Sequence, residues 1–588
     1  MMTMLKTGVF ALFAALSALI SLSPAAVCQA AQEPASGAPR YALPKWTIMV
    51  YINGKNNLEE YAFRNFFQME QVGSNSNVRV VVQLGRMGTY STKDGGWSGC
   101  RRYLVGHYPS DTNTISSPVV SSTSVCDMGD YNNAIDFFTW AKTNYPADHY
   151  MAMLWNHGSG WEKSRARLRG ISYDDQTNNH ITTPQMASIL SALGHIDLYS
   201  SDACLMQMAE VGYELKDYVD YIAGSEENEP GEGYQYATFL TAVNASDFSP
   251  RAVAKAAVDT YIDQYSAADG VTHSYIVTSA LPGLVTRINT LASALMSASE
   301  HSVVRAARTS AFNYGSAGDR DISYFASLVS SSTASSAVQT AALDLSSYTA
   351  NSVVLYNRTK GSDYVNSYGL SIYLPSSYSI TGYSELAFAQ NSTWPSFLNW
   401  LFNTVRVEGT ITLNGTPLAG VTVSASGGSS ASAVTDSNGV FALSLNKGAA
   451  YTLVPTKSGY VFSPASIPVA SLSADSSGNS FTSVPGSTAV LLGEASSYPN
   501  PFAALKGEKA KIHYTLDTAR DVKIRIYNTI GQLVWQQTFP AGTAGGTVGV
   551  NEVLWDGRNG DGKTVGRGIY LAALEAGGER VTLKVGVR

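Results

Sequence analysis

The sequence predicts an α/β domain with a mostly parallel sheet, followed by two small all-β sandwich domains. Over residues 46 to about 280, short apolar runs alternate with segments of helical periodicity, which is the pattern of a parallel sheet covered by helices on both faces. From about Val405 the helical periodicity disappears, and short alternating segments follow, separated by turn pairs such as Asn438-Gly439. That pattern is typical of β-sandwiches. The length of 588 residues allows roughly two to four domains.

In the α/β domain, each continuous apolar run predicts a buried strand and each amphipathic segment predicts a helix. The expected strands are, in chain order, 46–52, 78–84, 150–155, 196–199, 221–224, 274–278 and 369–374. The expected helices are 57–71, 135–143, 184–193, 206–215, 252–265 and 284–298. We expect this domain to occupy residues 45–404.

The two β domains are expected over 405–485 and 486–588. Strands of the first are predicted at 407–413, 421–425, 440–445 and 451–455. The Ser/Gly-rich stretch 471–486 predicts a linker. Strands of the second are predicted at 511–516, 522–527 and 569–574.

The composition excludes several classes of protein. Apolar residues make up 45% and aromatic residues 11%, which excludes wholesale disorder. The 39 Lys and Arg against 45 Asp and Glu give a formal charge of −6, and the sequence has no basic run or stripe. We therefore expect no nucleic-acid partner.

The first 30 residues have the layout of a secretory signal peptide. A lysine precedes an apolar run over 8–20, and small residues near Ala30 suit a cleavage point. The run is too short for a good membrane span, and a polar linker over 31–44 follows. A lipoprotein anchored through Cys28 stays open, although Val27 is bulky where a lipobox needs a small residue. We see no second apolar stretch long enough to cross a membrane, so we expect a secreted or cell-surface protein.

Three cysteines are left if the signal peptide is removed. Cys100 and Cys126 could pair in an oxidising compartment, and whether they do stays open at this stage. Cys204 would then be the free thiol.

Two reactive side chains follow neighbouring buried strands of the predicted sheet. His157 comes just after the strand at 150–155, and Cys204 comes just after the strand at 196–199. Ligands of open α/β sheets bind beyond the carboxyl ends of the strands, so we expect the imidazole and the thiol at one edge. A nearby base, and a helix beginning directly after the cysteine, would favour the thiolate. The backbone N–H groups of Gly158 and Cys204 are the expected oxyanion donors.

Four motifs in this region resemble the clostripain family of cysteine peptidases, which belongs to the caspase-like clan. They read WTIMVYINGKNNLE from Trp46, LWNHGSGW from Leu154, SSDACLMQMAEV from Ser200 and AGSEENEPGEGY from Ala223. The resemblance covers residues 45 to about 400, is strongest from Trp46 to Tyr236, and implies a caspase-like α/β/α sandwich.

The resemblance also implies an endopeptidase that cleaves after Arg or Lys, with His157 and Cys204 as its catalytic dyad. A basic substrate side chain needs a carboxylate at the base of its pocket. Asp202, two residues before the nucleophile, matches the family's acidic position, and Glu232 stands where a second acid is expected. Nearby alternates are Glu226 and Glu227.

Two further properties of the family have candidate residues here. Some members cleave themselves between the histidine and the cysteine, and Arg165, Arg167 and Arg169 form a basic cluster in that interval; a plain solvated loop is the alternative. Some members depend on calcium. The residues show no EF-hand spacing and predict no cofactor, and a calcium requirement stays open with the acidic pair Asp174-Asp175 as its candidate.

The β domains resemble accessory modules. VEGTITLNGTPLAGVTVSAS, from Val407, is similar to carboxypeptidase-regulatory-like β-sandwiches. YPNPF, from Tyr498, and VLWDGRNGDGKTVGRGIY, from Val553, are similar to the immunoglobulin-like domain of flagellar hook-capping proteins and to type IX secretion sorting domains. We interpret the last domain as a structural module that faces the cell surface, and whether it sorts, anchors or merely spaces the protein stays open at this stage.

Together these features predict a secreted cysteine endopeptidase that acts on proteins or peptides. A non-enzymatic surface or adhesion protein on an inactive peptidase scaffold is the main alternative, and an enzyme of the same clan with a non-basic preference is another. The intact motifs around His157 and Cys204 argue against an inactive scaffold.

Overall fold

The computed structural model describes residues 42–110, 113–161, 170–315, 318–378, 382–485 and 491–588. Of the predicted signal peptide and linker, only residues 42–44 belong to this part of the chain. Within the described residues, we find no helix that combines the length and the apolar character needed to cross a membrane.

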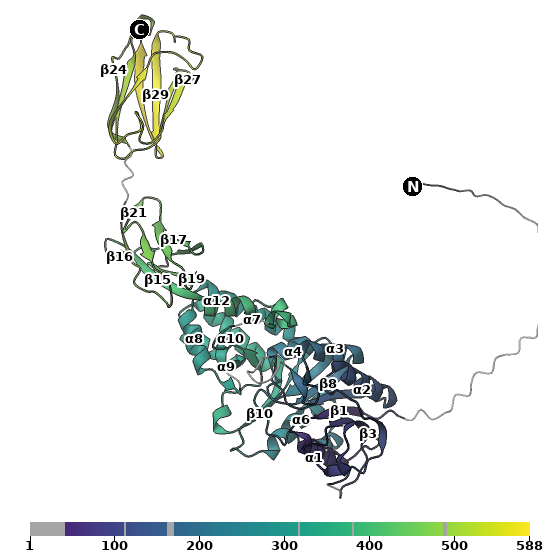
Figure 1. Ribbon diagram of the computed structural model, residues 1–588. Helices are drawn as coiled ribbons and strands as arrows, with labels where there is room; N and C mark the ends of the chain where they lie inside the picture. The colour runs from purple at the N-terminus through teal and green to yellow at the C-terminus, as the bar shows by residue number, and fades with distance from the viewer. Residues whose placement is uncertain (1–41, 111–112, 162–169, 316–317, 379–381, 486–490) are drawn as a thin grey trace, which may run out of the picture. The chain divides into compact units, whose positions relative to one another are not determined.

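The α/β domain is built on a nine-stranded sheet (Figure 1). Its strands are β1 (Trp46–Gly54), β2 (Val78–Arg86), β3 (Gly99–Leu104), β4 (Val119–Thr123), β5 (His149–Trp155), β8 (Ile196–Asp202), β9 (Val219–Gly224), β10 (Val271–Val277) and β13 (Val354–Lys360). Their spatial order is β13-β10-β9-β8-β5-β1-β2-β3-β4. The five strands from β9 to β2 pair in parallel, and the two strands added at each edge pair antiparallel. The predicted α/β fold around a parallel sheet is confirmed.

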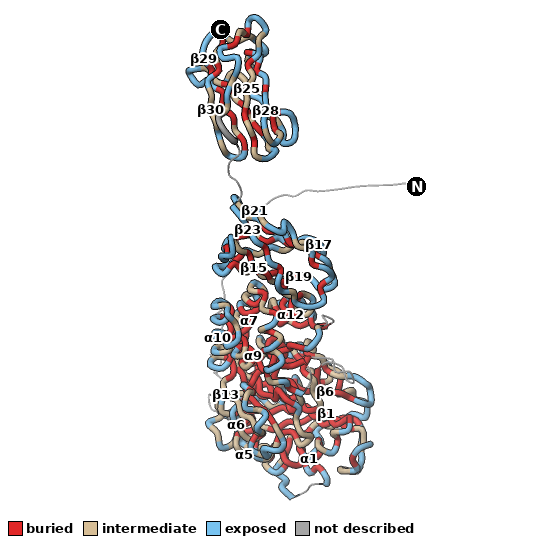
Figure 2. Tube along the Cα trace, turned by 90° about the vertical axis from the view of Figure 1, so that its left-hand side faces the viewer, coloured by how far each residue is buried: buried red, intermediate tan, exposed pale blue. Residues whose placement is uncertain are grey.

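Strand β1 shows why this sheet needs cover on both faces. All nine of its residues are buried, and successive side chains of a strand point to opposite faces. Met49 and Tyr51 belong to one hydrophobic core, whereas Ile48, Val50 and Ile52 belong to the other. In Figure 2 the chain around β1 is accordingly coloured as buried.

Helices supply the other half of each core. One face packs against α1 (Glu59–Glu70), α5 (Tyr236–Ala245) and α6 (Pro250–Gln264). The opposite core includes α2 (Tyr131–Asn144), α3 (Thr183–Leu193), α4 (Ala209–Leu215) and α7 (Leu281–Ser297). The remaining helices are α8 (His301–Ser310), α9 (Ile322–Ser332), α10 (Ser336–Tyr348), α11 (Ala387–Asn391) and α12 (Trp394–Asn403). Short strands are β6 (Ile171–Asp174), β7 (Asn179–Ile181), β11 (Asn313–Tyr314), β12 (Asp319–Asp321) and β14 (Ser371–Tyr373).

The remainder of the chain forms two all-β segments, each with a hydrophobic core of its own. The first contains β15 (Thr404–Leu413), β16 (Thr416–Pro417), β17 (Thr422–Gly427), β18 (Ala431–Val434), β19 (Val440–Asn446), β20 (Tyr451–Thr456), β21 (Tyr460–Ser463), β22 (Ile467–Val469) and β23 (Phe481–Pro485). The second contains β24 (Leu491–Tyr498), β25 (Ala510–Leu516), β26 (Val522–Tyr527), β27 (Leu533–Phe539), β28 (Gly549–Trp555), β29 (Gly568–Ala576) and β30 (Glu579–Val587).

The linker predicted at 471–486 is wrong for its last third. Strand β23 lies there and pairs in parallel with β15 and antiparallel with β21. Phe481 and Ser483 are buried while Thr482 is exposed, so the segment has a strand's alternation. Its Ser-rich and Gly-rich surroundings concealed this pattern.

The disulfide that the sequence left open is present. Cys100 in β3 is bonded to Cys126, with the two Cα atoms 5.9 Å apart. Cys204 is the free cysteine of the described residues.

Candidate active site

The register of the parallel strands places the two predicted catalytic residues at the same height along the strand direction, beyond the carboxyl ends of β5 and β8. Trp155 of β5 pairs with Asp202 of β8, so His157 and Cys204 each lie two residues beyond the same pair. On the other side, Trp155 pairs with Ile52 of β1. From β1 the chain first adds β2 on one side of β1. It later adds β5 on the other side of β1, and then β8 beyond β5. The point where the strand order reverses, at which open α/β sheets bind ligands, therefore lies between β1 and β5.

The loop after β5 is fixed by polar contacts on two sides. The side-chain amide of Asn156 donates to the carbonyl of Asn53 at 2.6 Å, and its Oδ1 accepts the N–H of Tyr173 at 2.7 Å. The carbonyl of His157 accepts the N–H of Ser172 at 3.3 Å. These bonds tie the backbone that carries the imidazole to the end of β1 and to β6.

Gly158 allows this loop to touch the nucleophile's segment. A Cβ at Gly158 would lie 2.4 Å from the carbonyl oxygen of Cys204 and 3.0 Å from the Cβ of Ala203. A larger residue would push the two segments apart. The imidazole-bearing loop and the thiol-bearing loop are thus in direct contact, as the two predicted oxyanion donors require.

The Cys204 thiol lies in a largely enclosed position. Its Sγ accepts the N–H of Glu229 at 3.3 Å. Burial raises the pKa of the thiol, and the backbone N–H groups of Glu229, Cys204 and Gly158 act against that rise. Because burial dominates, a base that takes the proton is needed for the thiol to act as a nucleophile near neutral pH.

The prediction of a helix starting directly after the nucleophile is wrong. The helix begins at Ala209, five residues after Cys204. Between them Leu205 adopts a left-handed φ of 62°, a conformation that costs a non-glycine residue free energy and often occurs at functional sites. The sequence pattern did not reveal this turn, because the apolar residues that follow it also fit a helix.

His157 and Cys204 line one cavity of about 170 Å³. The other residues that line it are Leu58, Trp155, Asn156, Asp202, Ala203, Glu229, Pro230, Gly231 and Gly233. The cavity is smaller than the pockets that hold drug-sized ligands, which are about 300 Å³ or more. It therefore suits a single side chain that enters beside the thiol and the imidazole.

Two carboxyl groups, Asp202 and Glu229, belong to this cavity. Asp202 is 4% exposed and accepts the O–H of Tyr236 at 2.7 Å and the N–H of Tyr234 at 3.3 Å. Oε1 of Glu229 is buried without a hydrogen-bond partner. Burial raises the pKa of Asp202 to about 6, and burial together with the charge of Asp202 raises the pKa of Glu229 well above its usual value. Burial and a neighbouring carboxyl disfavour the charged form of each group, and an opposite charge nearby favours it.

The other predicted pocket acids lie outside this cavity. The carboxylate of Glu232 pairs with Arg64 at 3.3 Å and lines a separate hollow. The carboxylates of Glu226 and Glu227 are buried but do not line the cavity. Glu229 is therefore the acid that the sequence analysis missed. The signal was the acid-rich run EENEPGE, but spacing alone does not tell which of its carboxylates points inward.

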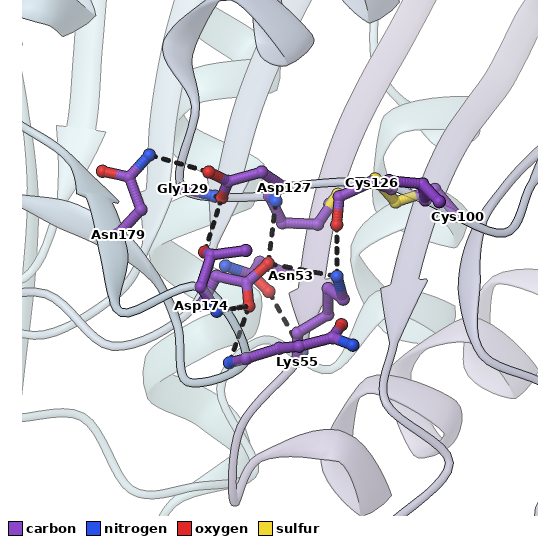
Figure 3. A network of polar contacts seen from close by, with 12 residues as sticks. Asn53, Lys55, Cys100, Cys126, Asp127, Gly129, Asp174 and Asn179 are labelled. Atoms are coloured by element: carbon purple, nitrogen blue, oxygen red, sulfur yellow. Dashed lines mark hydrogen bonds and ion pairs between the residues drawn. A yellow bond between two sulfur atoms is a disulfide. The ribbon is translucent and has the colours of Figure 1, made fainter.

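The acidic residue considered for calcium is used by the protein itself. Asp174 pairs with Lys55 at 3.3 Å, and its two oxygens accept three backbone N–H groups (Figure 3). Across the described ranges, no group of three or more His, Cys, Asp or Glu side chains is placed to hold a metal ion. The basic cluster Arg165, Arg167 and Arg169 lies outside the described residues.

Comparison with known families agrees with this geometry. The model of the clostripain family matches residues 50–401, which is more than half of the chain. This chain belongs to the clostripain family. A second model, that of the FlgD Ig-like domain, matches residues 500–579 and confirms the predicted likeness of the last domain to hook-capping proteins.

Three relatives show how far the similarity extends. Clostripain from Hathewaya histolytica is 30% identical over 225 residues, which cover 34% of this chain and 42% of that protein. The chain thus matches less than half the length of this curated relative. A secreted C11 cysteine protease from Bacteroides thetaiotaomicron, solved with an irreversible peptide inhibitor, is 22% identical over 61% of this chain and 99% of its own, with a TM-score of 0.46. An inactive zymogen C11 protease from Parabacteroides distasonis is 20% identical over 60% of this chain and 98% of its own, with a TM-score of 0.46.

Proposed function

We propose that this clostripain-family chain is a secreted cysteine endopeptidase that cleaves proteins and peptides after Arg or Lys. Its catalytic dyad is His157 and Cys204. The observation that carries the proposal is the single cavity that contains an imidazole, the free thiol and two buried carboxyl groups, Asp202 and Glu229. A site with these groups has a nucleophile, a base and a pocket for a cationic side chain.

The chemistry follows from these groups. His157 takes the proton of the Cys204 thiol as its sulfur attacks the scissile carbonyl carbon, and the carbonyl oxygen becomes an oxyanion. The backbone N–H groups of Gly158 and Cys204 are the proposed donors to that oxyanion. The imidazolium then gives its proton to the leaving amine, which leaves a thioester on the cysteine. Water, deprotonated by the same imidazole, hydrolyses the thioester and restores the thiol.

The preference for a basic residue follows from the two carboxyl groups. A guanidinium or ammonium group that enters the cavity gives Asp202 and Glu229 the opposite charge that their buried position lacks. An acidic residue would meet like charge, and a neutral one would leave both carboxyls without a cation. Arg and Lys are the side chains long enough to place a positive charge there from a backbone held at the thiol.

Export and maturation complete the proposal. The disulfide between Cys100 and Cys126 suits an oxidising compartment outside the cytosol, which supports the predicted signal peptide. An enzyme that cleaves after Arg would find suitable bonds in its own basic cluster at Arg165, Arg167 and Arg169. We propose self-cleavage there on the sequence alone.

A panel of fluorogenic peptides that differ only at the residue before the cleaved bond tests this function. We expect the wild type to cleave Arg and Lys peptides and to leave Glu, Leu and Ala peptides nearly untouched. Cys204→Ala and His157→Ala should each abolish hydrolysis, because thiol attack or proton transfer is lost, while circular dichroism shows an intact fold. A wild type that cleaves none of the peptides would favour the non-enzymatic alternative, and a panel led by a neutral residue would refute the basic preference.

A further inference from the structure

Tyr236 donates a hydrogen bond to Asp202, the proposed pocket acid. Its hydroxyl oxygen lies 2.7 Å from Oδ2 of Asp202 and 2.9 Å from the sulfur of Met153. A hydroxyl has one proton, and a carboxylate oxygen accepts it much better than a thioether does. The proton therefore points at the carboxylate. Asp202 lines the cavity, whereas Tyr236 is 1% exposed and does not line it.

The same short segment, residues 233–236, makes further contacts with this carboxyl group. The backbone N–H of Tyr234 lies 3.3 Å from each carboxylate oxygen of Asp202, which is long for an N–H donor. A Cβ at Gly233 would lie 2.3 Å from Oδ1, so a glycine is needed for the segment to lie this close. The hydroxyl of Tyr236 makes the shortest of these hydrogen bonds.

Neighbouring helices hold this segment in place. Oε1 of Gln68, in α1, accepts the backbone N–H of Tyr236 at 3.1 Å. At the end of α6, the side chains of Gln264 and Tyr265 donate to the carbonyl of Gly233 at 2.6 and 2.8 Å. The hydroxyl is thus presented to the pocket acid by a segment that is fixed at both of its ends.

This hydrogen bond is important because no cation supports the pocket acid within the cavity. None of the described residues that line the cavity is Lys or Arg. The titratable groups around Asp202 are those of Glu229, Tyr234, Tyr236, Tyr261 and Tyr265, together with Cys204 and His157 in the same cavity. Burial raises the pKa of Asp202, and the hydrogen bond from Tyr236 acts against that rise, because a donor favours the charged form.

We propose that Tyr236 is a positioning residue that supports the preference of the pocket for basic side chains. Its hydroxyl fixes the orientation of the Asp202 carboxylate and favours its charged form, so that the carboxylate pairs with the guanidinium or ammonium group of the substrate. Tyr236 touches neither the substrate nor Cys204 and acts through Asp202. This role rests on the proposed peptidase function and adds to it the residue on which the charge of the pocket acid depends.

Tyr236→Phe tests this role in the full chain, because it removes the hydroxyl and keeps the ring. At pH 6, KM for an Arg peptide should rise by about tenfold, the order expected for a hydrogen bond to a charged group, while kcat stays within about twofold. The rise should be smaller at pH 8, where Asp202 is charged even without the donor. The pH below which KM increases should move up by about one unit, and KM for a slow Leu peptide should not change.

Agmatine, which carries a guanidinium group on an alkyl chain, tests the same contact without cleavage. In calorimetric titrations at pH 6, Tyr236→Phe should raise the Kd for agmatine by the factor by which it raises KM. Tyr383→Phe is the matched control. Tyr383 is also fully buried and donates to a buried carboxylate, that of Glu210, at 2.8 Å, but neither residue lines the cavity. Neither KM nor Kd should change in this control.

The possible outcomes separate this role from the proposed function. Wild-type KM and Kd in Tyr236→Phe, or an equal loss of kcat on Arg and Leu peptides, would overturn the role of Tyr236 alone. Agmatine binding that depends on Tyr236 in a protein that cleaves no peptide would overturn the peptidase function alone. A wild type that neither cleaves Arg peptides nor binds agmatine would overturn both.

A second variant decides the question if Tyr236→Phe does not fold. Codon suppression can introduce 3-fluorotyrosine at position 236, which keeps the ring and the hydroxyl. The fluorine makes the hydroxyl a stronger donor, so the pH below which KM for Arg peptides increases should move down. An unchanged pH dependence of KM in this variant would overturn the role of Tyr236.

Discussion

Glu229 contributes to the site in two ways. Its backbone N–H contacts the sulfur of Cys204 at 3.3 Å, and its carboxyl group lines the cavity beside Asp202. A shift in the backbone at Glu229 would therefore change both the hydrogen bond to the thiol and the position of a carboxyl group in the cavity. We infer that selectivity for basic residues depends on Glu229 more than on the more exposed Glu232.

Substitutions of these two acids separate the roles. Glu229→Gln should lower kcat/KM on Arg peptides on the order of a hundredfold. It removes the carboxylate that would pair with the buried guanidinium of the substrate, and losing one partner of such a pair costs about a few kcal/mol. Glu232→Gln is the matched control, since its carboxylate is 37% exposed and pairs with Arg64, and it should stay within about twofold of the wild type. Equal losses in both variants, or a loss only in Glu232→Gln, would contradict this assignment.

The same carboxyl pair predicts a pH dependence of substrate binding. Burial raises the pKa of Asp202 to about 6, so the group gains a proton as the pH falls through that value. A protonated carboxyl no longer attracts a guanidinium, and KM for Arg peptides should therefore rise as the pH falls below about 6. KM for a slow neutral peptide should not rise in parallel. A KM for Arg peptides that is constant from pH 8 to pH 5 would contradict the prediction.

At the scale of elements, the sequence predicted the buried strands well and the edges poorly. Strands β1, β2 and β5 are continuous apolar runs because both of their faces are buried. All five residues of β4, two valines followed by three polar residues, are exposed, so the strand has neither a buried apolar run nor an apolar alternation. The position of His157 and Cys204 after their strands was predictable for the same reason, whereas the inward direction of Glu229 depends on a loop that periodicity does not describe.

The loop between β1 and α1 has a testable anchor in the buried ion pair of Lys55 and Asp174. Lys55→Met should destabilise the protein by about 3–5 kcal/mol, because it leaves Asp174 buried without its partner. Lys45→Met is the matched control, since Lys45 pairs with Asp148 at 2.8 Å with both side chains about half exposed, and it should cost at most about 1 kcal/mol. Chemical denaturation measures both values. Similar midpoints for the two variants would show that the buried pair does not hold this loop.

At the scale of the whole molecule, the residues of the candidate site all lie in the α/β domain. Each of the two β segments has its own core, centred on residues such as Phe441 in the first and Trp555 in the second, as expected of domains that fold alone. The loss of helical periodicity near Val405 and the short alternating segments after it predicted this division. Strand β23 was harder to predict, because only two of its five residues are buried and the Ser and Gly residues before it indicate a linker.

A truncation after Asn403 tests this division. The shortened protein should fold and cleave small Arg peptides with kcat/KM within about threefold of the full chain, because every proposed catalytic and pocket residue is retained. Surface retention or cleavage of large substrates should change instead. A truncated protein that melts cooperatively but has lost activity on small peptides would show that the β domains contribute to the active site.

Covalent labelling of the thiol tests the central claim most directly. A peptide-derived alkylating ketone that carries Arg at the position before the reactive group would be compared with one that carries Glu, and the adduct located by mass spectrometry. We expect one adduct per chain, on Cys204, formed at least tenfold faster with the Arg reagent and nearly absent in His157→Ala. Labelling at another residue, or equal rates with the Arg and Glu reagents, would contradict a cysteine peptidase with a pocket for basic side chains.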